Sequence, residues 1–288
     1  MNKKLYTYVL AITLIALAVG CAEDKLDAPV KTVPLSNDPL DIYIRENFLA
    51  PYNVAIRYKY VDRYVEGDKR VVPTDRDLVI PMLNFLDEYW IQPFLAVDNG
   101  EAFFKRYVPK EVVFIGSPIF NTDGTITLGT ADAGARITIT QVNEIDEENP
   151  DWVFLQLNTI YHEFAHIVHQ TFDLPASFEQ ISPRGYTSPG SWYTLSNEDA
   201  LKRGFVSPYA TTSFNEDFAE TAAFILFDPN FDENYLDLEV CNGDAECLER
   251  NAGRALIKTK YSSILRHYEQ HTGVKLLEVR EIIQDKLN

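Results

Sequence analysis

The residues best suited to chemistry lie in one short segment, His162-Glu163-Phe164-Ala165-His166. Four residues make just over one helical turn, so His162 and His166 would project from the same helix face and could bind one Zn²⁺ through imidazole nitrogens. Glu163 would then lie beside the metal, where its carboxylate can take a proton from an attacking water and pass it to the leaving amine. This spacing predicts metal-dependent hydrolysis of an amide bond.

A catalytic zinc ion needs a third protein ligand and one open coordination position. A third histidine ten residues after His162 is excluded, because Phe172 occupies that position. Glu216 and Glu220 are four residues apart and share one face of a predicted helix, so Glu216 can bind zinc while Glu220 hydrogen-bonds a ligating histidine. The alternative is an exposed acidic helix face, which the many apolar residues of this segment disfavour, because burying an unpaired carboxylate is costly.

The other histidines are weaker candidates. His169 lies three residues after His166, but it is about 10.5 Å of helical rise from His162, and a fourth protein ligand would fill the open position. We therefore expect His169 to support a ligand from behind or to pack against neighbours. His267 and His271 are also four residues apart, yet no carboxylate motif completes the set. We expect them at a solvated helix end.

The elements that must position these residues follow from hydrophobic periodicity. Apolar residues at helical spacing predict a helix from Asp151 to about Gln170 and further helices over 215–227, 255–270 and 276–287. In the amino half, the pattern predicts a strand over 53–60, a helix over 74–90 interrupted by Pro81, and short strands over 111–115, 125–128 and 135–142. The predicted class is α+β, with a small mixed sheet joined by hairpin turns and a mostly helical carboxyl half. The strand over 135–142 could pair with an extended peptide substrate.

The composition bounds the function. The chain has 288 residues, of which 46% are hydrophobic, enough for a sizeable core. Lysine and arginine number 26 against 43 acidic residues, giving a net charge of −17. A nucleic-acid partner is disfavoured, because no basic surface is available to neutralise phosphates. Three cysteines are too few for a cysteine-only zinc cluster, so a metal site must use histidines and carboxylates.

The amino terminus has the pattern of a targeting signal. Lys3 and Lys4 precede an apolar run, and Leu17-Ala18-Val19-Gly20 leads to Cys21. Small residues before a cysteine are what lipoprotein signal peptidase requires. We expect residues 1–20 to be removed, Cys21 to carry acyl chains, residues 21–39 to form a tether, and residues 40–288 to form the folded domain with its cleft near 150–220. The alternative is an ordinary secretory signal with an incidental cysteine.

Export would place the chain in an oxidising compartment. Cys241 and Cys247 flank a turn-rich loop, so we expect a disulfide between them. A redox or metal-binding pair is the alternative, but neither a CxxC spacing nor partner histidines support it.

Two sets of motifs resemble known families. The histidine motif, followed by Ser207-Pro208-Tyr209-Ala210-Thr211-Thr212 and Glu216-Asp217-Phe218-Ala219-Glu220, is similar to gluzincin metallopeptidases related to the catalytic domain of anthrax lethal factor. Together with the signal and Asn47-Phe48-Leu49-Ala50-Pro51-Tyr52-Asn53, the chain resembles the substrate import-associated zinc metallohydrolase lipoproteins. This resemblance implies a zincin-like fold, Zn²⁺ on His162, His166 and Glu216, and the company of a TonB-dependent receptor and a SusD-like lipoprotein.

The resemblance also bears on catalysis and location. A tyrosine at the position matching Tyr209 stabilises the oxyanion in lethal-factor-like relatives, and here Pro208 stiffens the loop that leads to the ligand helix. A core tyrosine is the alternative. Ala22-Glu23-Asp24-Lys25 resembles an acidic tag that sends lipoproteins to the outer face of the outer membrane, although a periplasmic orientation stays open.

Three functions fit these residues. The first is an outer-membrane-anchored zinc metallopeptidase that cleaves a peptide or protein substrate. The second is a zinc hydrolase of a non-peptide amide. The third is a non-catalytic substrate-binding lipoprotein with a structural zinc, which Glu163 disfavours because a structural site has no use for a base.

Overall fold

The computed structural model describes residues 35–65, 67–120, 126–127, 129–132, 136–188 and 190–287, and over 126–132 it describes the backbone alone. Within this part of the chain, residues from Pro39 onward belong to one compact unit. The predicted signal peptide over 1–20, the lipidation site Cys21 and most of the tether lie outside the described residues.

A small sheet forms one side of the compact unit. Its four strands lie in the order β1 (Ala55–Arg57), β2 (Glu111–Phe114), β6 (Arg136–Ile139) and β5 (Gly129–Asp132). β1 pairs with β2 and β2 with β6 in parallel, whereas β5 is antiparallel to β6. A separate antiparallel pair joins β3 (Ile119–Phe120) to β4 (Ile126–Thr127). The sheet is therefore mixed. Its parallel pairs, β1 with β2 and β2 with β6, are joined by crossovers, whereas the antiparallel pairs β3 with β4 and β5 with β6 are formed by consecutive strands, as the predicted hairpins require.

Burial on both faces explains the parallel pairing of β2. Val112 and Phe114 point into the main core beneath the helices, while Val113 and Ile115 point into a smaller cluster with Tyr64. Side chains alternate between the two faces of a strand, and parallel strands are usually covered on both faces. Because β6 is paired on both sides, it cannot accept a substrate strand. Among the described strands, the free edge beside β6 belongs to β5.

Helices of the amino half cover the sheet. α2 (Pro39–Ile44) runs through a π-helical stretch, Arg45–Leu49, into α3 (Ala50–Tyr52). The helix predicted over 74–90 exists as α4 (Val79–Leu86) and a π-helical turn, Asp87–Ile91, that leads into α5 (Gln92–Leu95). Pro81 lies in the first turn of α4, where its missing N–H leaves no helical bond unmade. α2 and α6 (Gly100–Tyr107) were not anticipated from the sequence.

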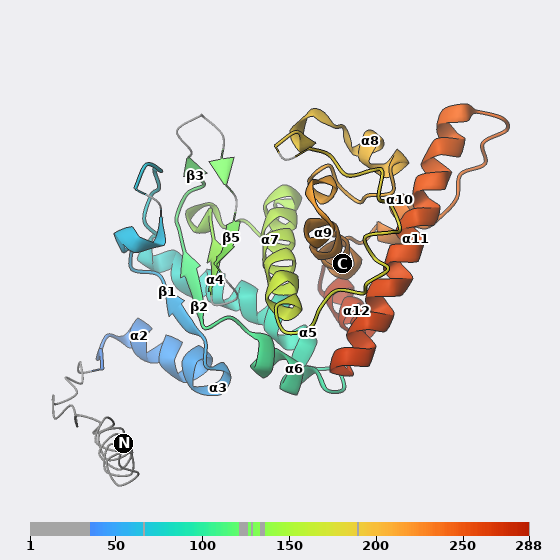
Figure 1. The fold of residues 1–288 in the computed structure, drawn as a ribbon. Coiled ribbons are helices and arrows are strands. Elements are labelled where there is room, and N and C mark those ends of the chain that lie inside the picture. Colours follow the sequence, from blue (N-terminus) through green and yellow to red (C-terminus); the bar gives the residue numbers. More distant parts are fainter. Residues whose placement is uncertain are drawn as a thin grey trace, which may run out of the picture. The chain divides into compact units, whose positions relative to one another are not determined.

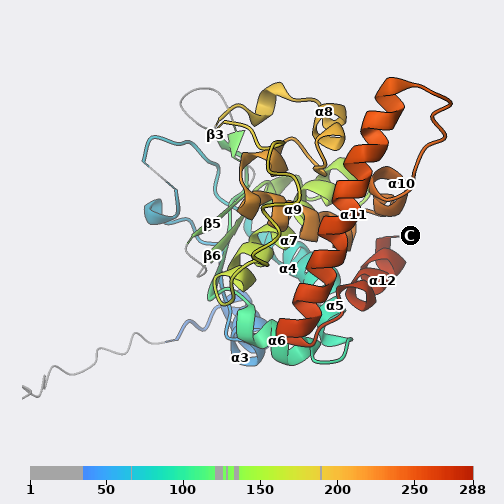
Figure 2. The same cartoon turned by 45° about the vertical axis from the view of Figure 1, so that its right-hand side comes forward.

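Helices dominate the carboxyl half, as predicted. α7 spans Pro150–His169, α9 Phe214–Phe227 and α12 Leu276–Leu287, each within a residue of its predicted bounds. α11 (Ala245–Thr272) begins ten residues earlier than predicted, because Asp244 caps its first turn, and it ends at Gly273 with a φ of 73°. Two short helices, α8 (Asn197–Lys202) and α10 (Phe231–Tyr235), lie between them. In Figure 1, α7 lies between the sheet and α9, and Figure 2 shows α11 crossing over α9.

Candidate metal centre

α7 places both histidines of the motif on one face. Asn149 caps the helix by accepting the backbone N–H groups of Asp151 and Trp152. On the opposite face, Phe164 packs edge-on against the rings of Trp90 and Phe94, at 5.5 Å between centroids. This aromatic packing fixes the rotation of α7 about its axis. The structure consequently brings the Nε2 atoms of His162 and His166 within 3.0 Å of each other.

α9 brings Glu216 to the same point. Ser213 caps the helix, its hydroxyl accepting the backbone N–H of Glu216 at 3.3 Å. α9 lies beside α7 (Figure 1), so a residue in its first turn faces the histidine motif. Oε2 of Glu216 lies 3.0 Å from Nε2 of His162 and 3.1 Å from Nε2 of His166. Residues 50 positions apart in sequence thus converge on one spot.

These three side chains fit a zinc ion. Ligand atoms around tetrahedral zinc lie about 3.3 Å apart, because each bond is about 2.0–2.1 Å long. The three atoms here are separated by 3.0–3.1 Å. Among the described residues, they form the one group of three or more such side chains close enough to hold a metal ion. Two imidazoles and one carboxylate leave the fourth tetrahedral position open, as catalytic zinc sites require.

The electrostatics of the site favour a positive charge between these groups. Burial lowers the pKa of His162, but the carboxylates of Glu216 and Glu220 outweigh it and raise the pKa to about 10. Burial raises the pKa of Glu216, but its contacts with His162 and His166 outweigh this and hold that pKa well below the usual range. A bound cation would occupy the place that a proton takes in its absence.

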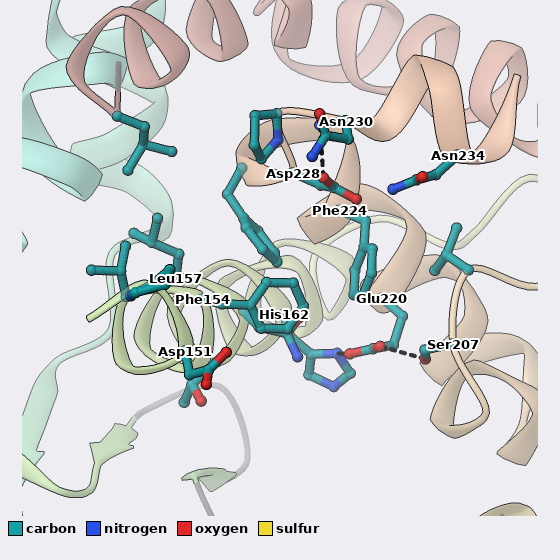
Figure 3. A pocket seen from close by; sticks show the side chains of 18 of the residues that line it. Asp151, Phe154, Leu157, His162, Ser207, Glu220, Phe224, Asp228, Asn230 and Asn234 are labelled. Atoms are coloured by element: carbon teal, nitrogen blue, oxygen red, sulfur yellow. Dashed lines mark hydrogen bonds and ion pairs between the residues drawn. The ribbon is translucent and has the colours of Figure 1, made fainter. Parts of the chain in front are cut away.

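Glu220 supports His162 from behind. Its Oε1 lies 2.9 Å from Nδ1 of His162, on the opposite side of the ring from Glu216. Its other oxygen, Oε2, accepts the hydroxyl of Ser207 at 2.6 Å, and Figure 3 shows both contacts. A carboxylate at the far nitrogen of a ligating histidine fixes the ring's orientation and tautomer. Glu220 therefore lies beside His162, as expected, and Ser207, to which no role was assigned from the sequence, holds its other oxygen.

Glu163 and Tyr209 both line the cavity that opens at His162. Tyr209 begins a 3₁₀ turn, Tyr209–Thr212, just before α9, and its ring centroid lies 5.7 Å from that of His162 and 5.3 Å from that of Trp192. Burial raises the pKa of Tyr209, and the charges of Glu216, Glu163 and Glu220 raise it further. The hydroxyl therefore keeps its proton at neutral pH, and the carboxylate of Glu216 is one acceptor within its reach. Its side chain is 37% exposed, so it is no core tyrosine.

The remaining histidines lie at the carboxyl end of α7, just beyond His166. His169 packs against Phe218, at 4.1 Å between ring centroids, and against Phe172 and His267. The position of His169 supports the expected packing role and does not support the alternative, contact with a metal-ligating residue. His267 is 7% exposed, so the expectation of a solvated helix end was wrong for it, while His271 is exposed. The reason is that α11 packs against α9 and α7 along the side that carries His267.

A buried ion pair anchors the ligand helix and was missed from the sequence. Lys260 of α11 and Asp217 of α9 are both fully buried, with Nζ 2.7 Å from Oδ2. Nζ also donates to the carbonyl of Gly204 at 2.6 Å and lies 3.7 Å from the centroid of the Phe205 ring. Tyr186 donates its hydroxyl to Asp217. Asp217 directly follows Glu216, so this network holds the start of α9 in place.

The two cysteines of the carboxyl half are joined. Cys241 and Cys247 form a disulfide with a Cα–Cα separation of 5.3 Å, as expected from the sequence. It closes the loop before α11 and lies away from the histidine motif.

Comparisons with known proteins agree with this site. The family model described as "Putative zinc-binding metallo-peptidase" matches residues 34–276. The crystal structure of "a putative zinc-binding metallo-peptidase from Bacteroides caccae ATCC 43185" is similar at a TM-score of 0.67 and 28% sequence identity, covering 86% of this chain and 91% of that one. No match is found among curated proteins.

Proposed function

The chain belongs to the zinc-binding metallo-peptidase family whose model matches residues 34–276, and from this premise we propose that it is a zinc-dependent peptidase of the gluzincin type. His162, His166 and Glu216 hold the metal, and Glu163 is the general base. The single observation that carries the proposal is the convergence of three ligand atoms, from α7 and α9, within 3.1 Å of one another. Glu163 lies next to the first ligand and lines the adjoining cavity.

Zinc bound there would supply a Lewis acid that polarises the substrate carbonyl and acidifies the attacking water. The carboxylate of Glu163 accepts a proton from that water as the new C–O bond forms, and delivers it to the amine nitrogen as the C–N bond breaks. The Tyr209 hydroxyl donates a hydrogen bond to the oxygen on which negative charge develops. Glu220 holds the His162 ring in the orientation that binding requires. The products are a carboxylic acid and an amine.

The edge of the sheet supports a peptide as substrate. β5 is the edge strand next to β6, and it lies beside α7 in Figure 1. An extended peptide could add to this edge through backbone hydrogen bonds. The strand expected from the sequence to do this, over 135–142, contains β6, which already has partners on both sides.

The experiment that tests this proposal separates metal binding from catalysis. Zinc content is measured by elemental analysis, and turnover is measured with a mixture of peptides whose products are identified by mass spectrometry. Glu163→Gln should retain zinc and lose turnover by about 10³-fold or more, whereas Glu216→Ala should lose the metal. Undiminished turnover in zinc-loaded Glu163→Gln, or wild-type zinc content in Glu216→Ala, would contradict the assigned roles.

The cellular setting is a further part of the proposal, supported by the sequence alone. Residues 1–20 and Cys21 have the pattern of a lipoprotein signal, so we infer a lipid-anchored protein of the outer membrane that works with a TonB-dependent receptor and a SusD-like lipoprotein. Cys21→Ser should move the protein from the membrane fraction to the soluble fraction and abolish acyl labelling. If wild-type protein carries no acyl group, this assignment fails. Among the described residues, no helix combines the length and apolarity needed to cross a membrane.

A further inference from the structure

A large cavity opens from the metal centre along the amino-terminal half of α7. It has a volume of about 1340 Å³, and its walls come from α7 and the residues just before it, the segment over 192–209, α9 with the segment leading into α10, and the end of α12, with Tyr89 at one point. Figure 3 shows Asp151, Phe154 and His162 on α7 on one side, and Glu220, Phe224 and Asp228 on the other. From His162 back to Asp151 the helix rises about 16 Å, so the cavity is long enough for about five residues of an extended peptide.

The floor of the cavity is apolar. Phe154 is 44% exposed, and its ring packs edge-on against Phe227 and Phe224, at 5.0 and 5.6 Å between centroids. Leu157 also lines the cavity. Such a floor would pack against the aliphatic part of a long side chain.

The rim of the cavity is acidic. Besides Glu163 and Glu220 of the metal centre, the exposed residues Glu147, Glu148 and Asp151 line it, and so does the buried Asp228, whose carboxylate already accepts the backbone N–H of Asn230. Among the described lining residues there is one lysine, Lys286, and no arginine. Nζ of Lys286 lies 3.6 Å from Glu88, so its charge is already shared with another carboxylate. A cationic group would therefore be attracted to this cavity, and an anionic group would be repelled.

An unpaired acceptor on the wall points to the same chemistry. Oδ1 of Asn158 is buried and has no hydrogen-bond partner among the described residues. Asn158 lines the cavity one helical turn before His162. A buried acceptor without a partner is costly, but this oxygen is closed off from solvent, so a substrate donor reaches it only if the Asn158 side chain turns toward the cavity. Ammonium and guanidinium groups carry three and five N–H donors and no acceptor.

We propose that this cavity is the substrate-specificity pocket and that it takes lysine or arginine side chains of a peptide, within about five residues of the cleaved bond on one side. The aliphatic part of the side chain lies on the Phe154 and Phe224 floor. Its charged end is held by the acidic rim. The inference rests on the proposed peptidase function, because it names the substrate class of that site.

The first experiment measures cleavage preference. Zinc-loaded full-length protein is incubated with a proteome-derived peptide library, and residues flanking each cleaved bond are identified by mass spectrometry. We expect lysine and arginine to be enriched on one side of the bond. In Asp151→Asn/Glu148→Gln this enrichment should fall about fivefold, as expected for the loss of weak ion pairs. The matched control, Glu249→Gln/Glu269→Gln, removes two exposed carboxylates of α11 outside the cavity and should keep the wild-type preference.

The second experiment tests the specificity of the pocket by binding, independently of turnover. Zinc-loaded Glu163→Gln is titrated with fluorescent, acetylated and amidated decapeptides that carry two lysines, two glutamines or two glutamates at the same positions. The lysine peptide should bind about tenfold tighter than the glutamine peptide, and the glutamate peptide weakest. The Asp151→Asn/Glu148→Gln changes should remove most of the difference. A fourth peptide, without lysine but with a free amino terminus, tests the α-amine as the recognised cation.

The outcomes separate the two hypotheses. If the zinc-loaded wild type cleaves no peptide, the peptidase function is refuted. Selective binding of the lysine peptide would still support an acidic pocket that binds cationic side chains. Three results would refute the proposed specificity. They are cleavage without a preference for lysine or arginine, a preference that is unchanged in Asp151→Asn/Glu148→Gln, and equal binding of the lysine and glutamine peptides. Tighter binding of the free-amine peptide than of the acetylated lysine peptide would also overturn it, because the recognised group would then be the peptide terminus.

Discussion

Glu220 Oε1 lies 2.9 Å from Nδ1 of His162, while Nε2 of the same ring lies 3.0 Å from the carboxylate of Glu216. One imidazole is therefore held from both sides by carboxylates four residues apart on α9. The relationship makes Glu220 a determinant of the ligand geometry without direct contact with the metal.

Glu220→Gln should weaken zinc binding by about 10–100-fold, because it removes the charge that orients and polarises His162. Zinc affinity is measured by competition with a chromophoric chelator. Ser207→Ala is the matched control, since it removes the hydroxyl that Glu220 accepts but leaves the carboxylate in place, and its effect should be smaller. An affinity for zinc in Glu220→Gln equal to that of the wild type would show that the contact has no such role.

Tyr209→Phe should lower the catalytic rate by about 10²–10³-fold while leaving zinc content and folding unchanged, because one donor to the transition state is lost. The rate is measured on metal-replete protein with saturating peptide. Tyr193→Phe provides the control, since Tyr193 is 70% exposed and lies in a 3₁₀ turn, Trp192–Thr194, that comes before α8. A Tyr209→Phe protein as active as the wild type would leave Tyr209 a structural role only.

Lys260→Met should destabilise the fold by about 3–5 kcal/mol, because it leaves Asp217 buried without its charge partner. Urea denaturation of the metal-free protein measures this change. In Lys260→Met/Asp217→Asn much of the loss should be recovered, since the amide can still accept the Tyr186 hydroxyl without carrying a charge. If the single and double variants are equally unstable, the loss comes from packing and not from the unpaired carboxylate.

His169 predicts a loss of stability in acid. Burial lowers the pKa of His169 to about 3, and nearby His267 and His166 contribute, while an unfolded chain titrates near 6.5. Between these two pH values, His169 is protonated in the unfolded state and neutral in the folded state. The free energy of unfolding therefore falls as pH decreases from 6.5 toward 3. The slope for one such group is at most about 1.4 kcal/mol per pH unit.

The measurement is urea denaturation of chelator-treated protein at pH 6.5, 5.5 and 4.5. His169→Leu should show a shallower decline over this range, because leucine cannot take up a proton in the unfolded state. His271→Gln changes an exposed histidine of the same cluster and should follow the wild type. Parallel pH profiles for wild type and His169→Leu would rule out His169 as the source of acid sensitivity.

The local chemistry of the site could be predicted from the sequence because it follows from helix geometry. The four-residue spacing of His162 and His166, and of Glu216 and Glu220, fixes which side chains share a face whatever surrounds the helix. Ser213, three residues before Glu216, is also a local signal for the start of α9. α7, α9 and α12 were placed within a residue for the same reason, since their apolar stripes repeat within a few turns.

Long-range contacts decided the rest. Whether β6 or β5 lies at the edge depends on strand pairing between distant segments, which alternation within a strand does not encode. The burial of His267 and the pairing of Lys260 with Asp217 both arise where α11 packs against α9. Lys260 and Asp217 are 43 residues apart in sequence. A lysine in an amphipathic helix pattern predicts a solvent-exposed position. Lys260 can be buried because Asp217, from another helix, pairs with its charge. The acidic cavity has the same origin, because its walls come from segments far apart in sequence, around 89, 147–163, 192–209, 220–235 and 286–287, that meet only in the folded chain.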